Sequence, residues 1–152
     1  KKDLLGAAQS ITPTMLNYSE MHEGASMYNT PPTFAWYMAG KIFKWLKSMG
    51  GISEIEKLNN QKAKKLYSFI DQSEFYRNGI NKEDRSIMNI PFQLRQEDLN
   101  EQFLIDSRDA GLLALKGHRS VGGMRASIYN AMPEEGVDAL IDFMELFEKD
   151  KS

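Results

Sequence analysis

The apolar residues of this chain recur every three or four positions in several stretches, a spacing that indicates helices. The first stretch runs from Phe34 to Met49, with Thr33 as its expected N-cap, and Gly50–Gly51 ends it. A second helix is expected to begin near Ser53, which opens a Ser-Glu-Ile-Glu capping box, and to run to about Asp71. Its predicted buried stripe consists of Ile55, Leu58, Ala63, Leu66, Tyr67 and Ile70.

Two more helices are expected in the second half of the chain. One covers residues 96–109 and ends at Gly111, a fitting C-cap. The other starts at Pro133, with Glu134 and Glu135 near its positive end. Its apolar stripe consists of Val137, Leu140, Ile141, Met144 and Phe147. Residues 1–32, in contrast, are expected to form loops and short extended pieces without a helix.

Strands are predicted where apolar residues alternate or form short runs. Residues 86–94 alternate, and Pro91 favours an edge or a bulge for that strand. Leu112–Leu115 is expected to be a short buried strand, and residues 124–129 another. The prediction is therefore an α/β fold with a sheet of two to four strands, covered by helices on one face. The glycine pair suggests a domain boundary, with residues 1–50 on one side and 51–152 on the other.

Composition narrows the possible functions. The 152 residues are 41 % hydrophobic and 26 % charged, which is typical of a soluble globular protein. No apolar run approaches the ~20 residues that span a membrane, so no membrane partner is expected. The net charge of −2 argues against a nucleic-acid-binding surface. The absence of cysteine excludes disulfides and thiolate catalysis, and the two distant histidines make a metal site unexpected.

The segment Lys116–Arg125 concentrates positive charge in this acidic chain. It holds three permanent cations, one histidine and three glycines, with no acidic residue. Glycine lets a backbone approach a ligand closely, and the arginine fork matches carboxylate and phosphate oxygens. We therefore expect Arg119 and Arg125 to converge on one pocket for a small doubly anionic metabolite. The alternative from composition alone is a solvated basic surface.

Three longer segments carry a family resemblance: Tyr28–Thr33, Asp84–Phe92 and Gly117–Ala131. They resemble the C-terminal part of the phosphoserine aminotransferases, which are pyridoxal-phosphate enzymes with the aspartate aminotransferase fold (fold type I). The resemblance extends over essentially the whole chain. It implies that residues 1–50 form the end of the large cofactor-binding domain and residues 51–152 a small C-terminal α/β domain.

The resemblance also implies roles for five residues. Arg125 would bind the α-carboxylate of the amino-acid substrate. His118 and Arg119 would bind the distal anionic group, a phosphate or the side-chain carboxylate of glutamate. Asn29 and Thr30 would reach across a homodimer interface to the phosphate of the neighbouring subunit's pyridoxal 5'-phosphate. Without the resemblance, Asn29 and Thr30 fit equally well as a turn, and His118 as a structural histidine.

The implied reaction moves an amino group between L-glutamate and 3-phosphohydroxypyruvate, giving O-phosphoserine and 2-oxoglutarate in the cytoplasm. Relatives also act on a phosphorylated hydroxythreonine in pyridoxine biosynthesis. The lysine that holds the cofactor is expected upstream of this sequence, so no catalytic residue is assigned within it, and the polypeptide alone is expected to be inactive. Two alternatives stay open: a non-catalytic small-anion-binding module and a dimerisation module.

Overall fold

The computed structural model describes residues 2–151, and the chain divides into two compact units, Lys1–Ser48 and Met49–Ser152. The helices of the first unit are α1 (Tyr18–Glu23) and α2 (Thr33–Ser48), which follow two 3-10 turns, η1 (Lys2–Leu4) and η2 (Thr14–Leu16). None of its described residues, 2–48, is buried. No helix among residues 2–151 is long and apolar enough to cross a bilayer.

The prediction that residues 1–32 lack a helix is wrong, because α1 lies within them. Its N-cap is Asn17, whose side-chain oxygen accepts a hydrogen bond from Ser19 N at 3.1 Å. The helix is only six residues long, so its sequence is too short to show the periodic apolar stripe from which helices are predicted. The helix expected after Thr33 is present as α2, with Thr33 as its first residue and not its cap.

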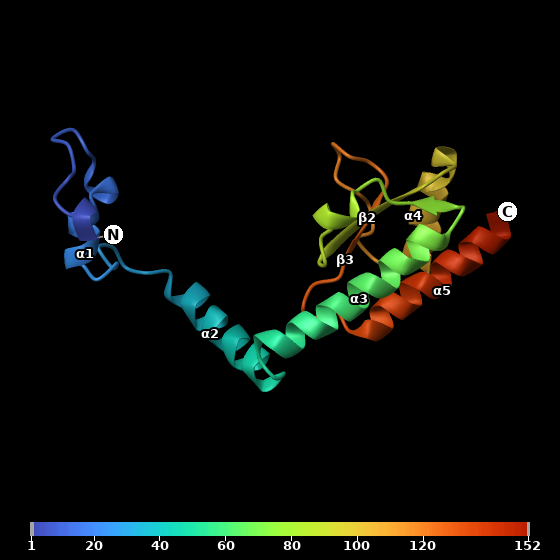
Figure 1. Ribbon diagram of the computed structural model, residues 1–152, viewed down its shortest axis with the longest axis horizontal. Helices are drawn as coiled ribbons and strands as arrows, with labels where there is room; N and C mark the ends of the chain where they lie inside the picture. Colours follow the sequence, from blue (N-terminus) through green and yellow to red (C-terminus); the bar gives the residue numbers. More distant parts are fainter. Residues whose placement is uncertain (1, 152) are drawn as a thin grey trace. The chain divides into compact units, whose positions relative to one another are not determined.

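The second unit carries a small sheet and three longer helices (Figure 1). Its elements in chain order are α3 (Ile52–Gln72), β1 (Tyr76–Arg77), η3 (Lys82–Asp84), β2 (Asn89–Leu94), η4 (Glu97–Leu99), α4 (Asn100–Asp109), β3 (Met124–Ser127) and α5 (Glu134–Lys151). The strands form an antiparallel sheet in the order β1-β2-β3. Figure 1 shows α3 and α5 running side by side, in agreement with their contacts.

All three helices contribute to one core on one face of the sheet, as predicted. Alternate residues of β2 and β3 are buried there, while the residues between them point to the opposite, open face. Phe103 of α4 is fully buried and meets Phe92 of β2 edge to face, with ring centroids 5.9 Å apart. The other rings around Phe103 belong to Tyr76, Phe143 and Phe147. The core therefore joins β1, β2, α4 and α5 through one aromatic cluster.

Two details of α3 differ from prediction. The helix begins at Ile52, one residue before Ser53, and its N-cap is Gly51 at φ +81°, so Ser53 forms no capping box. Leu58 is 40 % exposed and does not join the buried stripe. Instead two polar residues, Asn59 and Lys62, are buried on this helix.

Pro91 lies in the central strand, not at an edge or bulge, and the local pairing explains why. The N–H of Arg125, its partner in β3, donates to Leu115 O at 2.7 Å and so points away from β2. Pro91 therefore occupies a non-hydrogen-bonded pair, where the N–H that proline lacks would face away from β3. On that side β1 ends before it reaches Pro91.

The predicted buried strand Leu112–Leu115 is also wrong. Leu113 is 70 % exposed, and only Leu115 of the four residues is buried. Ala114 has φ +61°, which interrupts the extended backbone. Only at its end does the chain meet the sheet: Leu115 O accepts a hydrogen bond from Arg125 N, and the next residue, Lys116, forms an isolated bridge with Met124. A strand and a turn that buries one leucine can both have an apolar run of this length, so the sequence pattern does not separate them.

Candidate anion-binding site

Arg125 is the second residue of β3 and lies on the open face of the sheet, because its neighbours Met124 and Ala126 are buried toward the helices. Its side chain is half-buried, and its Nε atom is enclosed without any hydrogen-bond partner among residues 2–151. A buried donor without an acceptor costs about 1–3 kcal/mol. Arg125 also forms no ion pair with a described residue, so its charge is available for an external anion.

The loop before β3 is closed tightly by its own backbone. Gly117 N donates to Gly123 O at 2.9 Å, and His118 O accepts from Val121 N and Gly122 N at 2.9 and 2.8 Å. A Cβ on Gly117 would lie 2.1 Å from Gly122 O, so only glycine fits there. Gly122 and Gly123 have φ +74° and +59°, which glycine adopts without strain. The glycines of the basic segment thus fix the shape of the loop, as predicted.

His118 and Arg119 lie on this loop and are exposed. The N–H of Ser120 donates to His118 Nδ1 at 3.3 Å, and Ser120 Oγ lies 2.7 Å from the same nitrogen. Because Nδ1 accepts a hydrogen bond from the Ser120 N–H, the neutral form of the ring carries its proton on Nε2. That proton is free to be donated to an anion. Arg119 has no ion pair with any residue that the structure describes.

The open face beside Arg125 carries a polar cluster that sequence analysis missed. Asn89 Oδ1 accepts from Ser127 Oγ at 3.3 Å and from Tyr129 Oη at 3.1 Å. Asn89 pairs with Ser127 across the strands, and Arg125 lies two residues before Ser127 on the same face. The alternation along β2 and β3 could have predicted this neighbourhood once the pairing register was known.

A cavity of about 240 Å³ adjoins the basic loop at Val121 and Gly122. Its other lining residues are Arg77, Gly79, Ile80, Pro91, Phe92 and Gln93. Neither Arg119 nor Arg125 lines it, so the convergence of these two arginines on one pocket stays a prediction. Arg77 is held by Glu97, with Nη2 3.0 Å from Oε1.

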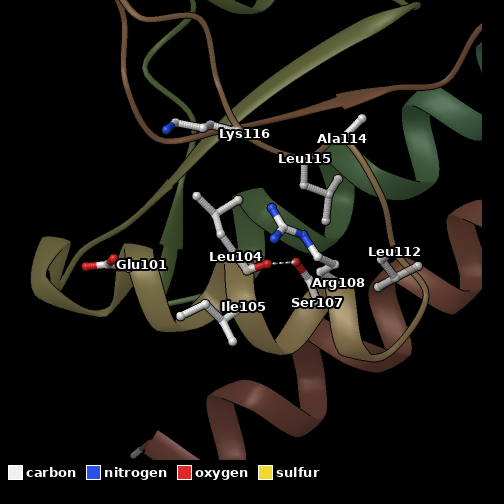
Figure 2. A pocket seen from close by; sticks show the side chains of 9 residues that line it. All are labelled: Glu101, Leu104, Ile105, Ser107, Arg108, Leu112, Ala114, Leu115 and Lys116. Atoms are coloured by element: carbon white, nitrogen blue, oxygen red, sulfur yellow. Dashed lines mark hydrogen bonds between the residues drawn. The ribbon is translucent and has the colours of Figure 1, made fainter.

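Another cavity of about 290 Å³ lies between α4 and the segment 112–116 (Figure 2), and none of the predicted site residues lines it. Leu104, Leu112 and Leu115 give it an apolar lining, and Ser107 Oγ is bonded within the helix to Leu104 O at 3.2 Å. Figure 2 shows Arg108 reaching between Leu104 and Leu115, whereas Lys116 and Glu101 point outward. The polar groups do not converge, and we assign this cavity no ligand.

Asn29 and Thr30 belong to the first unit, in the exposed turn before α2. Asn29 Nδ2 donates only to Met15 Sδ, at 3.3 Å, and the Thr30 hydroxyl has no partner among residues 2–151. A thioether is a weak acceptor, so both side chains keep donor capacity for a stronger one. An amide and a hydroxyl fit a phosphate, and this donor set is compatible with the phosphate of pyridoxal 5'-phosphate.

The family model "Aminotransferase class-V" matches residues 2–140. A phosphoserine aminotransferase from Bacillus circulans subsp. alkalophilus is 44 % identical, with a TM-score of 0.90 over 99 % of this chain and 42 % of that one. A phosphoserine aminotransferase described for radiation damage of its Schiff base is 47 % identical, with a TM-score of 0.89 over the same shares.

A PLP-bound phosphoserine aminotransferase from Trichomonas vaginalis is 43 % identical, with a TM-score of 0.81 over 91 % of this chain and 40 % of its own. The sequence therefore spans about two-fifths of the solved chains that it matches.

Proposed function

The chain belongs to the class-V aminotransferase family, and from this we propose that the protein containing it is a pyridoxal-phosphate-dependent phosphoserine aminotransferase. It transfers the amino group of L-glutamate to 3-phosphohydroxypyruvate and releases O-phosphoserine and 2-oxoglutarate. The identity of 44–47 % to phosphoserine aminotransferases over 99 % of the chain supports this substrate pair. Both substrates carry an anion at each end, which suits a site with separate cationic groups.

The observation that carries the proposal is that the half-buried Arg125 guanidinium has no hydrogen-bond or ion-pair partner among residues 2–151. In this proposal the α-carboxylate of the substrate accepts hydrogen bonds from this guanidinium and neutralises its charge. Arg125 sits on a strand, and a strand holds a side chain more rigidly than a loop does. Its role is to hold the substrate in one orientation.

His118 and Arg119 bind the distal anion in this proposal. Both are exposed on the loop that leads into β3. The bond from Ser120 N leaves the His118 Nε2 proton for the ligand, and Arg119 adds a full charge. Because this loop is closed by Gly117 and Gly123, it can present both groups with little loss of backbone entropy.

Asn29 and Thr30 hold the phosphate of pyridoxal 5'-phosphate in this proposal, across the interface of a homodimer. When bound, that cofactor would supply the electron sink that stabilises the substrate carbanion. The two neutral donors would fix its phosphate without adding charge. We place the enzyme in the cytoplasm, in serine biosynthesis; action on a phosphorylated hydroxythreonine of pyridoxine biosynthesis stays a prediction from the resemblance.

The decisive experiment is steady-state kinetics of the full-length protein with Arg125→Ala. Losing one charge-assisted contact with the substrate costs about 2–4 kcal/mol, a decrease of roughly 30- to 1000-fold in kcat/KM for glutamate. Arg95→Ala is the matched control, because Arg95 is exposed and lies outside the loop and β3. It should change kcat/KM less than twofold. A change below threefold for Arg125→Ala would contradict the assignment of this arginine to the substrate.

A further inference from the structure

Lys62 is a buried lysine in the apolar stripe of α3, with 3 % of its surface exposed. Its Nζ atom donates to three main-chain carbonyls: Ile128 O at 3.3 Å, Tyr129 O at 2.9 Å and Met132 O at 2.8 Å. An ammonium group has three N–H donors, so the three carbonyls use all of them. Lys62 forms no ion pair with a described residue, so its contacts are with the backbone and not with an acid.

These carbonyls all belong to one segment, residues 128–132, which connects β3 to α5. The same face of α3 touches the segment once more, because Asn59 Nδ2 donates to Asn130 Oδ1 at 2.8 Å. Asn59 lies three positions before Lys62, one helical turn away. We call these four hydrogen bonds the α3 clamp. They fix the chain directly after the last residue of β3, Ser127.

An apolar side chain could fill the volume of Lys62 but could not donate to the carbonyls. Leaving a buried carbonyl without a donor is costly, and burial of the ammonium is costly as well. The pKa of Lys62 is lowered from its ordinary value because burial disfavours the charged form. Lys62 therefore holds the backbone of residues 128–132 in one conformation, although burial of its charge is costly.

The backbone held in this way carries Arg125. Ile128 N donates to Met88 O at 2.9 Å, which continues the β2–β3 register in which Pro91 faces Arg125. Strand β3 precedes the clamp and is only four residues long. Near its start, Arg125 N donates a hydrogen bond to Leu115 O. A shift of the strand by one residue would turn Arg125 from the open face toward the helices. The clamp is thus the anchor at one end of a short strand whose function depends on its register.

We propose that Lys62 is a positioning residue for the carboxylate site: it holds the exit of β3 so that Arg125 points at the substrate. The inference rests on the proposed function for the identity of that substrate. It predicts that removing the Lys62 donors weakens substrate binding through Arg125, beyond any general loss of stability.

The test uses the full-length enzyme loaded with its cofactor and the variant Lys62→Met. We expect KM for glutamate to rise about tenfold, with kcat changed less than threefold. Ile70→Ala, a buried α3 residue outside the clamp, is the control for lost stability and should leave KM within twofold. Lys62→Arg keeps donors for the carbonyls and should recover most of the affinity. Equal KM values for Lys62→Met and wild type would overturn the proposal.

A double-mutant cycle separates positioning from a merely structural role. In an Arg125→Ala background, Lys62→Met should raise KM no further, because the group that it positions is gone. An additional tenfold increase there would also overturn the proposal. If Lys62→Met does not fold, Asn59→Ala removes the fourth bond of the clamp and should show the same non-additivity at a smaller size, about threefold. An unchanged KM for Asn59→Ala would then refute it.

A readout independent of turnover keeps this inference distinct from the proposed function. Amide hydrogen exchange should be at least tenfold faster at Arg125 and Ile128 in Lys62→Met than in Ile70→Ala. If the wild-type protein showed no transamination while this exchange difference appeared, the proposed function would fail and the clamp would stand. Unchanged exchange at both amides would refute the clamp whatever the activity.

Discussion

Helices α2 and α3 show the same apolar periodicity but bury very different fractions of it. In α3, five apolar and two polar residues are buried, because the helix packs on the sheet and on α5. In α2 none is buried, and Trp36 remains 58 % exposed. Apolar spacing, together with cap and glycine signals, predicts both helices. The comparison shows that periodicity predicts a helix and its apolar face, whereas burial depends on which elements lie near enough to cover that face.

The two units differ in the same way as these helices. Six ion pairs and nine ring–ring contacts among the described residues lie in Met49–Ser152. In the first unit, Lys41 Nζ contacts the Tyr37 ring, at 5.3 Å from its centre. The unit Lys1–Ser48 contains many apolar side chains, but none of its residues 2–48 is buried, so they form no core. We therefore expect the cooperative unfolding of this chain to report on the second unit, and two pairs of substitutions test that.

The largest contrast should come from one aromatic residue in each unit. Phe103→Ala removes a fully buried ring that meets four others, and we expect a loss of about 3–5 kcal/mol in the free energy of unfolding. Trp36→Ala removes a largely exposed ring, and we expect a change below about 0.5 kcal/mol. Urea titrations of the 152-residue chain measure both. Similar losses for the two variants would show that α2 is buried in solution.

A second contrast uses glycines with opposite surroundings. Gly117→Ala would place a Cβ against Gly122 O in the basic loop, and overpacking of this kind costs about 1–3 kcal/mol. Gly40→Ala, inside α2, meets nothing within 4 Å and should favour the helix by about 1 kcal/mol. Thermal unfolding measures the first effect, and the helical circular-dichroism signal the second. A neutral Gly117→Ala would mean that the loop is not closed as described.

Much of the fold could be predicted from the sequence, since the long helices and the strands at 86–94 and 124–129 follow local periodicity. The failures share a cause. Leu112–Leu115 and Pro91 were judged from local preference, but their outcome depends on pairing: Arg125 N bonds to Leu115 O and so leaves the position of Pro91 without a ladder bond to lose. Strand pairing is a long-range property that no short window contains.

The candidate site, like the fold, has features that the sequence predicts and features that depend on tertiary contacts. The composition of Lys116–Arg125 pointed to an anion site, and the resemblance supplied the roles of Arg125 and its neighbours. Neither could reveal that Arg125 Nε is enclosed, or that Lys62 holds the backbone beyond β3. A lysine amid apolar residues of a helix was the one available signal for the clamp. The sequence does not show which groups this lysine contacts, whereas the structure identifies them as three main-chain carbonyls.

The smallest contrast concerns pH and the pair Asp71–Arg85 of the second unit. Arg85 Nη1 and Nη2 lie 2.8 and 2.7 Å from the two carboxylate oxygens, and the guanidinium stacks 4.5 Å from the centre of the Tyr67 ring. The hydrogen bonds from Arg85 hold the pKa of Asp71 below its ordinary value. The pair therefore adds stability that is fully present above the unfolded pKa of about 4 and is lost as pH falls through the lower, folded value.

Replacing Asp71 by asparagine should remove this pH dependence. Because the pair is partly solvated but bidentate, we expect a loss of about 0.5–1 kcal/mol at pH 6 that shrinks as the pH is lowered below 4. Urea titrations at pH 6 and pH 3 measure the difference between variant and wild type. Glu54→Gln is the matched control, since Glu54 and Lys57 form an exposed pair on the same helix that should contribute little at either pH. An equal loss for Asp71→Asn at both pH values would assign its effect to packing, and the acid sensitivity of the second unit would then need another carboxylate.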